Sequence, residues 1–100
     1  MEFEWDSVKE ERNLHKHGIS FVAAARVLES QQVVIFPSDR LGEQRWVAVG
    51  MSPGDQRVIA VVFTMRSGRY RIISARRARK NEEESFRQGF ESKRQEGESR

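Results

Sequence analysis

The alternation of apolar and polar residues predicts two elements at the start of the chain. Phe3 and Trp5 alternate with acidic residues, as in a short half-exposed strand. Asp6 can then cap the open amides of a helix over residues 7–17. Gly18 follows at the position where a helix commonly ends in a left-handed residue. The pattern therefore predicts a strand followed directly by a helix.

Two further helices are predicted from capping signals. Ser20 is a candidate N-cap, and the apolar residues after it fall on one face of a helix that should end near Ser30. Another helix should begin near Asn81, whose side chain can cap while Glu84 reaches back in a capping-box pattern. The apolar stripe of the helix after Ser20 consists of Phe21, Ala24, Ala25, Val27 and Leu28.

Four runs typical of strands lie between these helices, at residues 32–36, 44–50, 57–65 and 70–75. Turn-like residues separate them, which favours an antiparallel meander. The third run is apolar on both alternating faces, so it should be the central strand, covered on both sides. The predicted fold is α+β, a small antiparallel β-meander packed with two N-terminal helices and one C-terminal helix. In the last run, alternation places Tyr70, Ile72 and Ser74 on one face and Arg71, Ile73 and Ala75 on the other.

The length of 100 residues suits a single domain, which we place at residues 1–90. Residues 91–100 contain no apolar side chain, and we expect a polar, disordered tail there. The chain has no cysteine, and its two histidines lack further ligands at a recognisable spacing, so we expect no metal ion. Without a secretory signal or an apolar run long enough to span a membrane, a cytoplasmic location is expected.

Positive charge is concentrated in one segment of the chain. Residues 66–80 contain seven basic side chains and no acid, so they carry +7 and the remainder −4 of the net +3. We predict that these arginines converge on one end and one face of the sheet, where their planar forks can bind a phosphate. The alternative is a solubilising surface that pairs with the acidic N-terminal half and residues 82–84. The basic residues are Arg66, Arg69, Arg71, Arg76, Arg77, Arg79 and Lys80.

Other candidate functional residues lie outside this segment. Lys9, Asn13 and His17 are spaced by four and should project from one helical face, although a solvated face with His17 closing the helix explains them equally well. Glu43, in the turn before residues 44–50, can supply a carboxylate or simply be solvated. Tyr70 is expected to be the most exposed aromatic residue and can stack on a nucleic-acid base.

Four spaced motifs carry a resemblance to a known family. They are Trp5-Asp6-x-x-Lys9-x-x-x-Asn13-x-x-Lys16-His17-Gly18-x-x-Phe21, Gly42-Glu43-x-Arg45, Thr64-x-Arg66 and Arg71-Ile72-Ile73-Ser74-Ala75-Arg76-x-Ala78. Together, over about residues 3–90, they resemble the BrnT family of bacterial toxins. The resemblance implies a RelE-like fold and a type II toxin–antitoxin toxin, a ribonuclease that inhibits translation. It also implies a BrnA-type DNA-binding antitoxin as partner in a hetero-oligomer, through which the toxin would reach operator DNA indirectly.

Metal-independent RNA cleavage needs a group that accepts the 2′-hydroxyl proton, a donor for the leaving 5′-oxygen, and cations for the phosphate charge. The resemblance and the charge pattern both assign Arg66 and Arg76 to the phosphate. Lys9 and His17 are candidates for proton transfer, and Glu43 is a third. Histidine titrates near neutral pH and can transfer a proton in either direction. Further RNA contacts are expected from Arg69, Tyr70, Arg71, Arg77, Arg79 and Lys80, and no cofactor is expected.

Two functions of other classes are compatible with the same basic residues. A nucleic-acid-binding module would bind RNA or DNA with strongly salt-dependent affinity and never cleave it. A toxin-fold scaffold would instead use the basic face to hold an acidic antitoxin segment and act as a co-repressor. Turnover of a labelled RNA distinguishes an enzyme from both.

Overall fold

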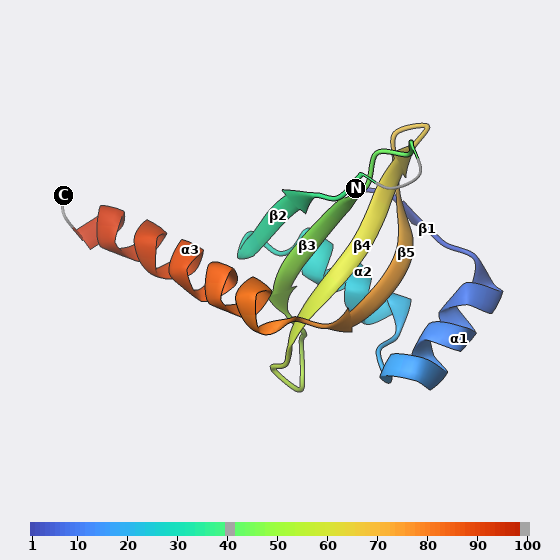
Figure 1. The fold of residues 1–100 in the computed structure, drawn as a ribbon, viewed down its shortest axis with the longest axis horizontal. Helices are drawn as coiled ribbons and strands as arrows, with labels where there is room; N and C mark the ends of the chain where they lie inside the picture. The colour runs from blue at the N-terminus through green and yellow to red at the C-terminus, as the bar shows by residue number, and fades with distance from the viewer. Residues whose placement is uncertain (40–41, 99–100) are drawn as a thin grey trace.

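A five-stranded mixed sheet forms the centre of the fold, with strand order β1-β5-β4-β3-β2 (Figure 1). The computed structural model describes residues 1–39 and 42–98, and the side chains of these residues up to position 89. The elements are β1 (Phe3–Glu4), α1 (Ser7–His17), α2 (Phe21–Glu29), β2 (Val33–Pro37), β3 (Trp46–Met51), β4 (Val58–Arg66), β5 (Arg69–Arg77) and α3 (Lys80–Glu98).

The N-terminal helices begin and end where the capping signals predict. The Asp6 side chain accepts hydrogen bonds from the backbone N–H groups of Val8 and Lys9 at the start of α1. Gly18 ends α1 in the left-handed conformation, with φ of 70°. Ser20 caps α2 by accepting from the N–H of Ala23. Both predicted helices are thus confirmed.

Strands β2 to β5 form the predicted antiparallel meander, with β4 at the centre of the sheet. Ser67 and Gly68 both have positive φ, which matches the twist of the tight β4–β5 hairpin. The sheet as a whole is mixed, because β1 adds to the edge parallel to β5, with Phe3 opposite Tyr70. The pairing of such a distant segment is a tertiary event that local patterning does not reveal.

A β-bulge in β5 changes which side chains share a face. Ile72 and Ser74 pair with consecutive residues of β4, so Ile73 is the additional residue in the ladder. Ile72 and Ala75 therefore belong to the same buried cluster. The prediction that strict alternation places them on opposite faces is wrong, because one inserted residue shifts the alternation of everything after it.

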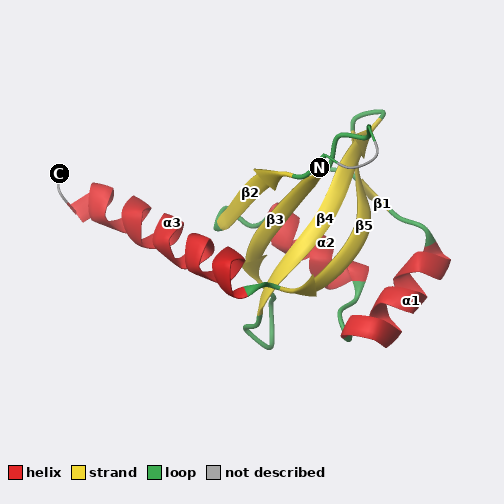
Figure 2. Ribbon diagram, in the orientation of Figure 1, coloured by secondary structure: helices red, strands yellow, loops and turns green. Residues whose placement is uncertain are grey.

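The helices cover the two faces of the sheet unequally (Figure 2). One face packs against α2, and α1 lies along β5. On the other face α3 packs on β2 and β3 only through its first turns, so much of the β4–β5 surface stays outside this contact. The α2-side cluster includes Phe21, Val27, Ile59, Val61 and Ile72, and the α3-side cluster includes Val47, Val49, Val58, Ala60 and Phe86.

Helix α3 begins one residue earlier than predicted. Glu82, rather than Glu84, reaches back to the helix start, where its Oε1 accepts from the N–H of Arg79 at 2.8 Å. The capping assignment of Asn81 is therefore wrong. The helix continues to Glu98, over most of the segment expected to be a disordered tail, whereas residues 99–100 lie outside the described residues. Glutamate, lysine, arginine and glutamine are good helix formers, which is consistent with this extension.

None of the helices in the described part of the chain is long and apolar enough to cross a membrane.

Candidate functional site

Three arginines of the basic segment share the sheet face that α3 covers only in part. Arg76 lies opposite Ala60, a residue of the α3-side cluster, and Arg71 lies opposite Thr64 on the same face. Arg66 is at the hairpin, six residues along β4 from Ala60, which corresponds to about 20 Å. The arginines thus share a face, but the prediction that they converge on one end is wrong. The paired strands β4 and β5 have nine residues each, and this length separates Arg66 from Arg76.

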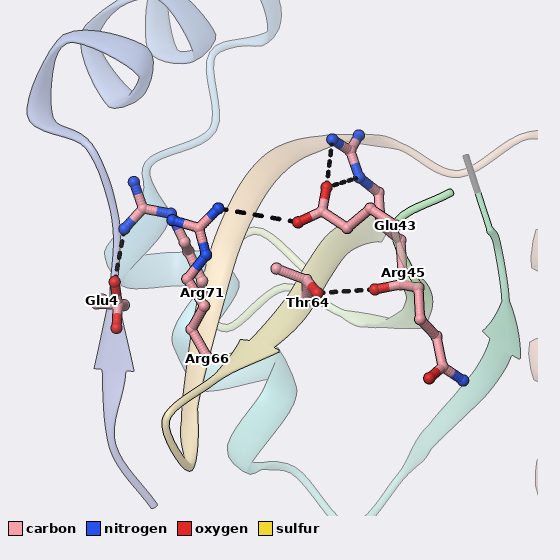
Figure 3. A network of polar contacts seen from close by, with 7 residues as sticks. Glu4, Glu43, Arg45, Thr64, Arg66 and Arg71 are labelled. Carbon is pink, nitrogen blue, oxygen red and sulfur yellow. Dashed lines mark hydrogen bonds and ion pairs between the residues drawn. The ribbon is translucent and has the colours of Figure 1, made fainter. Parts of the chain in front are cut away.

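The hairpin-end cluster consists of Glu4, Glu43, Arg45, Thr64, Arg66 and Arg71 (Figure 3). Arg71 donates to Glu4 at 2.6 Å, and both side chains are less than one-third exposed. Glu43 lies between two arginines, 2.9 Å from Arg45 and 3.9 Å from Arg66. The Arg66 side chain is 58% exposed, so its ion pair with Glu43 is weak.

Thr64 links two backbone segments of this cluster through a hydrogen bond. Its hydroxyl donates to the backbone carbonyl of Gln44 at 2.7 Å, which ties the segment carrying Glu43 to the end of β4. Glu43 was predicted as a proton-transfer candidate, but both its carboxylate oxygens face arginines. This arrangement suits a residue that orients arginines.

Arg76 forms a two-pronged contact with Glu82 at the other end of the face. Its Nη1 and Nη2 donate to the two carboxylate oxygens at 2.7 and 3.0 Å. The side chains are 21% and 13% exposed, so the pair is largely screened from water. These hydrogen bonds hold the pKa of Glu82 below its ordinary value and raise the pKa of Arg76. The guanidinium is therefore charged and fixed in orientation.

Replacing Glu82 by glutamine should remove a pH-dependent part of the stability. Because the pKa of Glu82 in the folded state lies below its ordinary value of 4.5, its contribution is fully present above that pH. It is lost as the pH falls through the lowered pKa. Urea denaturation should therefore show wild type more stable than Glu82→Gln at about pH 7, with a difference that shrinks as the pH falls through the lowered pKa.

Glu83→Gln is the matched control, since Glu83 lies on the same helix and pairs with Arg87 at an exposed position. This variant should differ little from wild type at about pH 7 or at lower pH. A stability difference between wild type and Glu82→Gln that does not change with pH would contradict the assignment.

A cleft of about 320 Å³ separates α1 from β5, and the predicted row on α1 lines it. Lys9, Asn13 and His17 do share one face of α1. Ser74, from the bulged part of β5, also lines the cleft. Lys9 is exposed and His17 is half-buried. The structure therefore brings both proton-transfer candidates to one cleft beside β5.

Asn13 is not part of a solvated face, because it is only 7% exposed. Its amide nitrogen donates to the carbonyls of Ile19 and Ala75 at 3.0 and 2.9 Å. Its amide oxygen accepts from the N–H of Ala75 at 3.1 Å. The side chain thus makes hydrogen bonds to the β5 backbone beyond the end of β1, as a neighbouring strand would, and it holds α1 against β5. The four-residue spacing predicted the helical face on which Asn13 lies but not its hydrogen bonds to the backbone.

The remaining basic residues divide between paired and exposed. Arg69 is 3.2 Å from Glu2. Arg66, Arg71 and Arg76 are also paired with glutamates, so part of the basic segment forms the acid-paired surface that the sequence offered as an alternative. Arg77, Arg79 and Lys80 are exposed.

Tyr70 is not the exposed aromatic residue that the sequence suggested. It is half-buried, and its ring lies 5.7 Å from that of Phe3 and 5.6 Å from that of Phe63. The parallel pairing of β1 places Phe3 against it. The expectation of exposure is wrong because it did not include this pairing.

Arginines along one sheet face of a small α+β domain, with lysine and histidine side chains at a neighbouring cleft, are features typical of the class of proteins that act on nucleic acids. A family model described as the ribonuclease toxin BrnT of type II toxin–antitoxin systems matches residues 5–82. The chain therefore belongs to the BrnT family of ribonuclease toxins, as the motifs predicted. The match includes the α1–β5 cleft, the Arg76–Glu82 pair and the hairpin-end cluster except Glu4. No curated protein matches the chain.

Proposed function

We propose that the protein is a cytoplasmic, metal-independent endoribonuclease that inhibits translation. The observation that carries the proposal is the α1–β5 cleft, which places Lys9 and His17 beside the strand that bears Arg71 and Arg76. Ser74 lines this cleft and lies between the two arginines on β5. Cations for a phosphate and groups for proton transfer are thus neighbours on one surface.

The separation of Arg66 from Arg76 argues that they bind different phosphates of one RNA. Arg76 is two residues from Ser74, about 7 Å along the strand, and Glu82 holds both prongs of its guanidinium, so we assign it to the scissile phosphate. Arg66 and Arg71, at the hairpin end, then hold a flanking phosphate. Single-stranded RNA that follows β5 would contact both sites.

The proposed reaction starts with removal of the 2′-hydroxyl proton. We assign this role to His17, because α1 continues past the Asn13–Ala75 contact toward the Arg76 end of β5. The 2′-oxygen then attacks phosphorus, and the bond to the 5′-oxygen breaks. Lys9 supplies the proton to the leaving oxygen, and Arg76 stabilises the charge that accumulates on the phosphate.

The basic face also supports the proposed partners. We propose that a BrnA-type antitoxin covers the face with acidic side chains, replacing the internal carboxylates of weak pairs such as Arg66–Glu43. The resulting hetero-oligomer would reach operator DNA through the antitoxin. Two N-terminal helices, a meander and a C-terminal helix also support a RelE-like fold.

The test is incubation of the purified chain with a labelled structured RNA in EDTA. Wild type should cleave the RNA, and His17→Ala should cleave about 10²-fold more slowly because it lacks a proton-transfer group. His15→Ala is the matched control, since His15 is exposed on the same helix and does not line the cleft. It should retain wild-type activity.

Two other outcomes of this assay would contradict the proposal. Cleavage that stops in EDTA and returns with Mg²⁺ would contradict metal independence. Intact RNA under both conditions, with binding that weakens steeply as salt is added, would favour the nucleic-acid-binding module.

A further inference from the structure

A second cavity, of about 250 Å³, lies between α3 and the β2–β3 side of the sheet. Phe36 and Val47 line it from neighbouring strands, where they are opposite each other in the register. Asn81 and Ser85 line it from successive turns of α3. Arg76, which we assign to the scissile phosphate, also borders the cavity.

We propose that this cavity binds a single unstacked base of the RNA, next to the phosphate that is cut. The inference rests on the proposed ribonuclease function and names a substrate contact for it. Proteins recognise single-stranded RNA by stacking a splayed base on an aromatic ring or an arginine plane and by hydrogen bonding its edges. Phe36 and Arg76 supply such surfaces, and Asn81 supplies a donor and an acceptor.

The size of the cavity favours one base. Drug-sized ligands occupy cavities of roughly 300–1,000 Å³, so this volume suits a smaller, flat group. Most of the lining residues are polar or charged, and Phe36, Pro37 and Val47 provide the apolar part. Polar groups in such a lining can orient a base through hydrogen bonds to its edges. Arg79 at the same cavity can contact a phosphate attached to the bound nucleotide.

Two of the lining residues, Asn81 and Arg76, are available for contacts with a base. Glu82, not Asn81, reaches back to cap α3, so the Asn81 amide is left for a ligand. Glu82 also holds the Arg76 guanidinium through two hydrogen bonds, which keeps this plane at the wall of the cavity in one orientation. A preformed wall lowers the entropic cost of binding a base.

The experiment is an NMR titration of the full chain with the four nucleoside 5′-monophosphates at millimolar concentration. At least one of them should shift the side-chain amide signal of Asn81 and the ring signals of Phe36. Asn81→Ala should weaken this binding by roughly three- to tenfold, the effect of losing one hydrogen bond. Phe36→Leu keeps an apolar side chain and should weaken it by roughly tenfold through loss of stacking.

Gln88→Ala is the matched control, because it removes an exposed amide from the same helix outside the cavity. It should bind the nucleotides as wild type does. Absence of shifts at Asn81 and Phe36 with all four nucleotides would overturn the inference, as would equal affinity of wild type and Asn81→Ala.

RNA cleavage provides the second readout. Wild type should prefer one base beside the cut, and Asn81→Ala should flatten that preference. RNA cleavage by a protein whose cavity binds no nucleotide would overturn the inference and leave the proposed function standing. Nucleotide binding in the cavity without any RNA cleavage would overturn the proposed function and leave base binding in the cavity standing.

Discussion

Arg76→Ala should lower the single-turnover rate of RNA cleavage by about 10²–10³-fold. Arg76 is two residues along β5 from Ser74 of the α1–β5 cleft, and Glu82 holds its fork in a fixed orientation. A donor prepositioned at developing charge contributes more than one that must first be ordered. Cleavage of a labelled RNA with enzyme in excess measures the chemical step directly.

The design must separate catalysis from folding. Removing Arg76 leaves the Glu82 carboxylate, 13% exposed, without its main partner, at a cost of about 1–3 kcal/mol. Thermal unfolding should show that the variant remains folded at the assay temperature. Arg26→Ala, which removes an exposed arginine on α2, is the matched control and should cleave normally.

The hairpin end should contribute separately. Arg66→Ala should cost little stability, since that side chain is 58% exposed, and the Arg66→Ala/Arg76→Ala double variant should not be toxic when expressed without antitoxin. Full toxicity of both single variants would rule out the arginine assignment.

Asn13→Leu should lower the free energy of unfolding by about 3–5 kcal/mol, a large part of the about 5–15 kcal/mol typical of a domain. The substitution removes the partner of three backbone groups, namely the carbonyls of Ile19 and Ala75 and the N–H of Ala75. Each buried group left without a partner costs about 1–3 kcal/mol. Urea denaturation of both proteins measures the difference.

Two further variants show whether the hydrogen bonds are responsible. Asn13→Asp keeps the acceptor for Ala75 but loses both donors, so it should also be strongly destabilised. Leu14→Ala changes a neighbouring residue of α1 that is 49% exposed and should shift stability by only about 0.5 kcal/mol. An Asn13→Leu protein as stable as Leu14→Ala would show that α1 is held to β5 by other contacts.

The sequence by itself determined the local elements and the family. Asp6, Gly18 and Ser20 act on backbone groups within a few residues, so their effects can be read from the neighbouring positions. The hairpin at Ser67 and Gly68 is equally local. The spaced motifs identified the BrnT family, and the run of arginines indicated where phosphate binding should be sought.

Only the tertiary structure decided how these residues meet. The β-bulge at Ile73, the parallel pairing of β1 and the contact between Asn13 and Ala75 join segments distant in the chain. The distance between Arg66 and Arg76 depends instead on how many residues of β4 and β5 are paired. Strand register and side-chain pairing depend on which distant groups compete for each hydrogen bond, and local spacing contains no record of that competition.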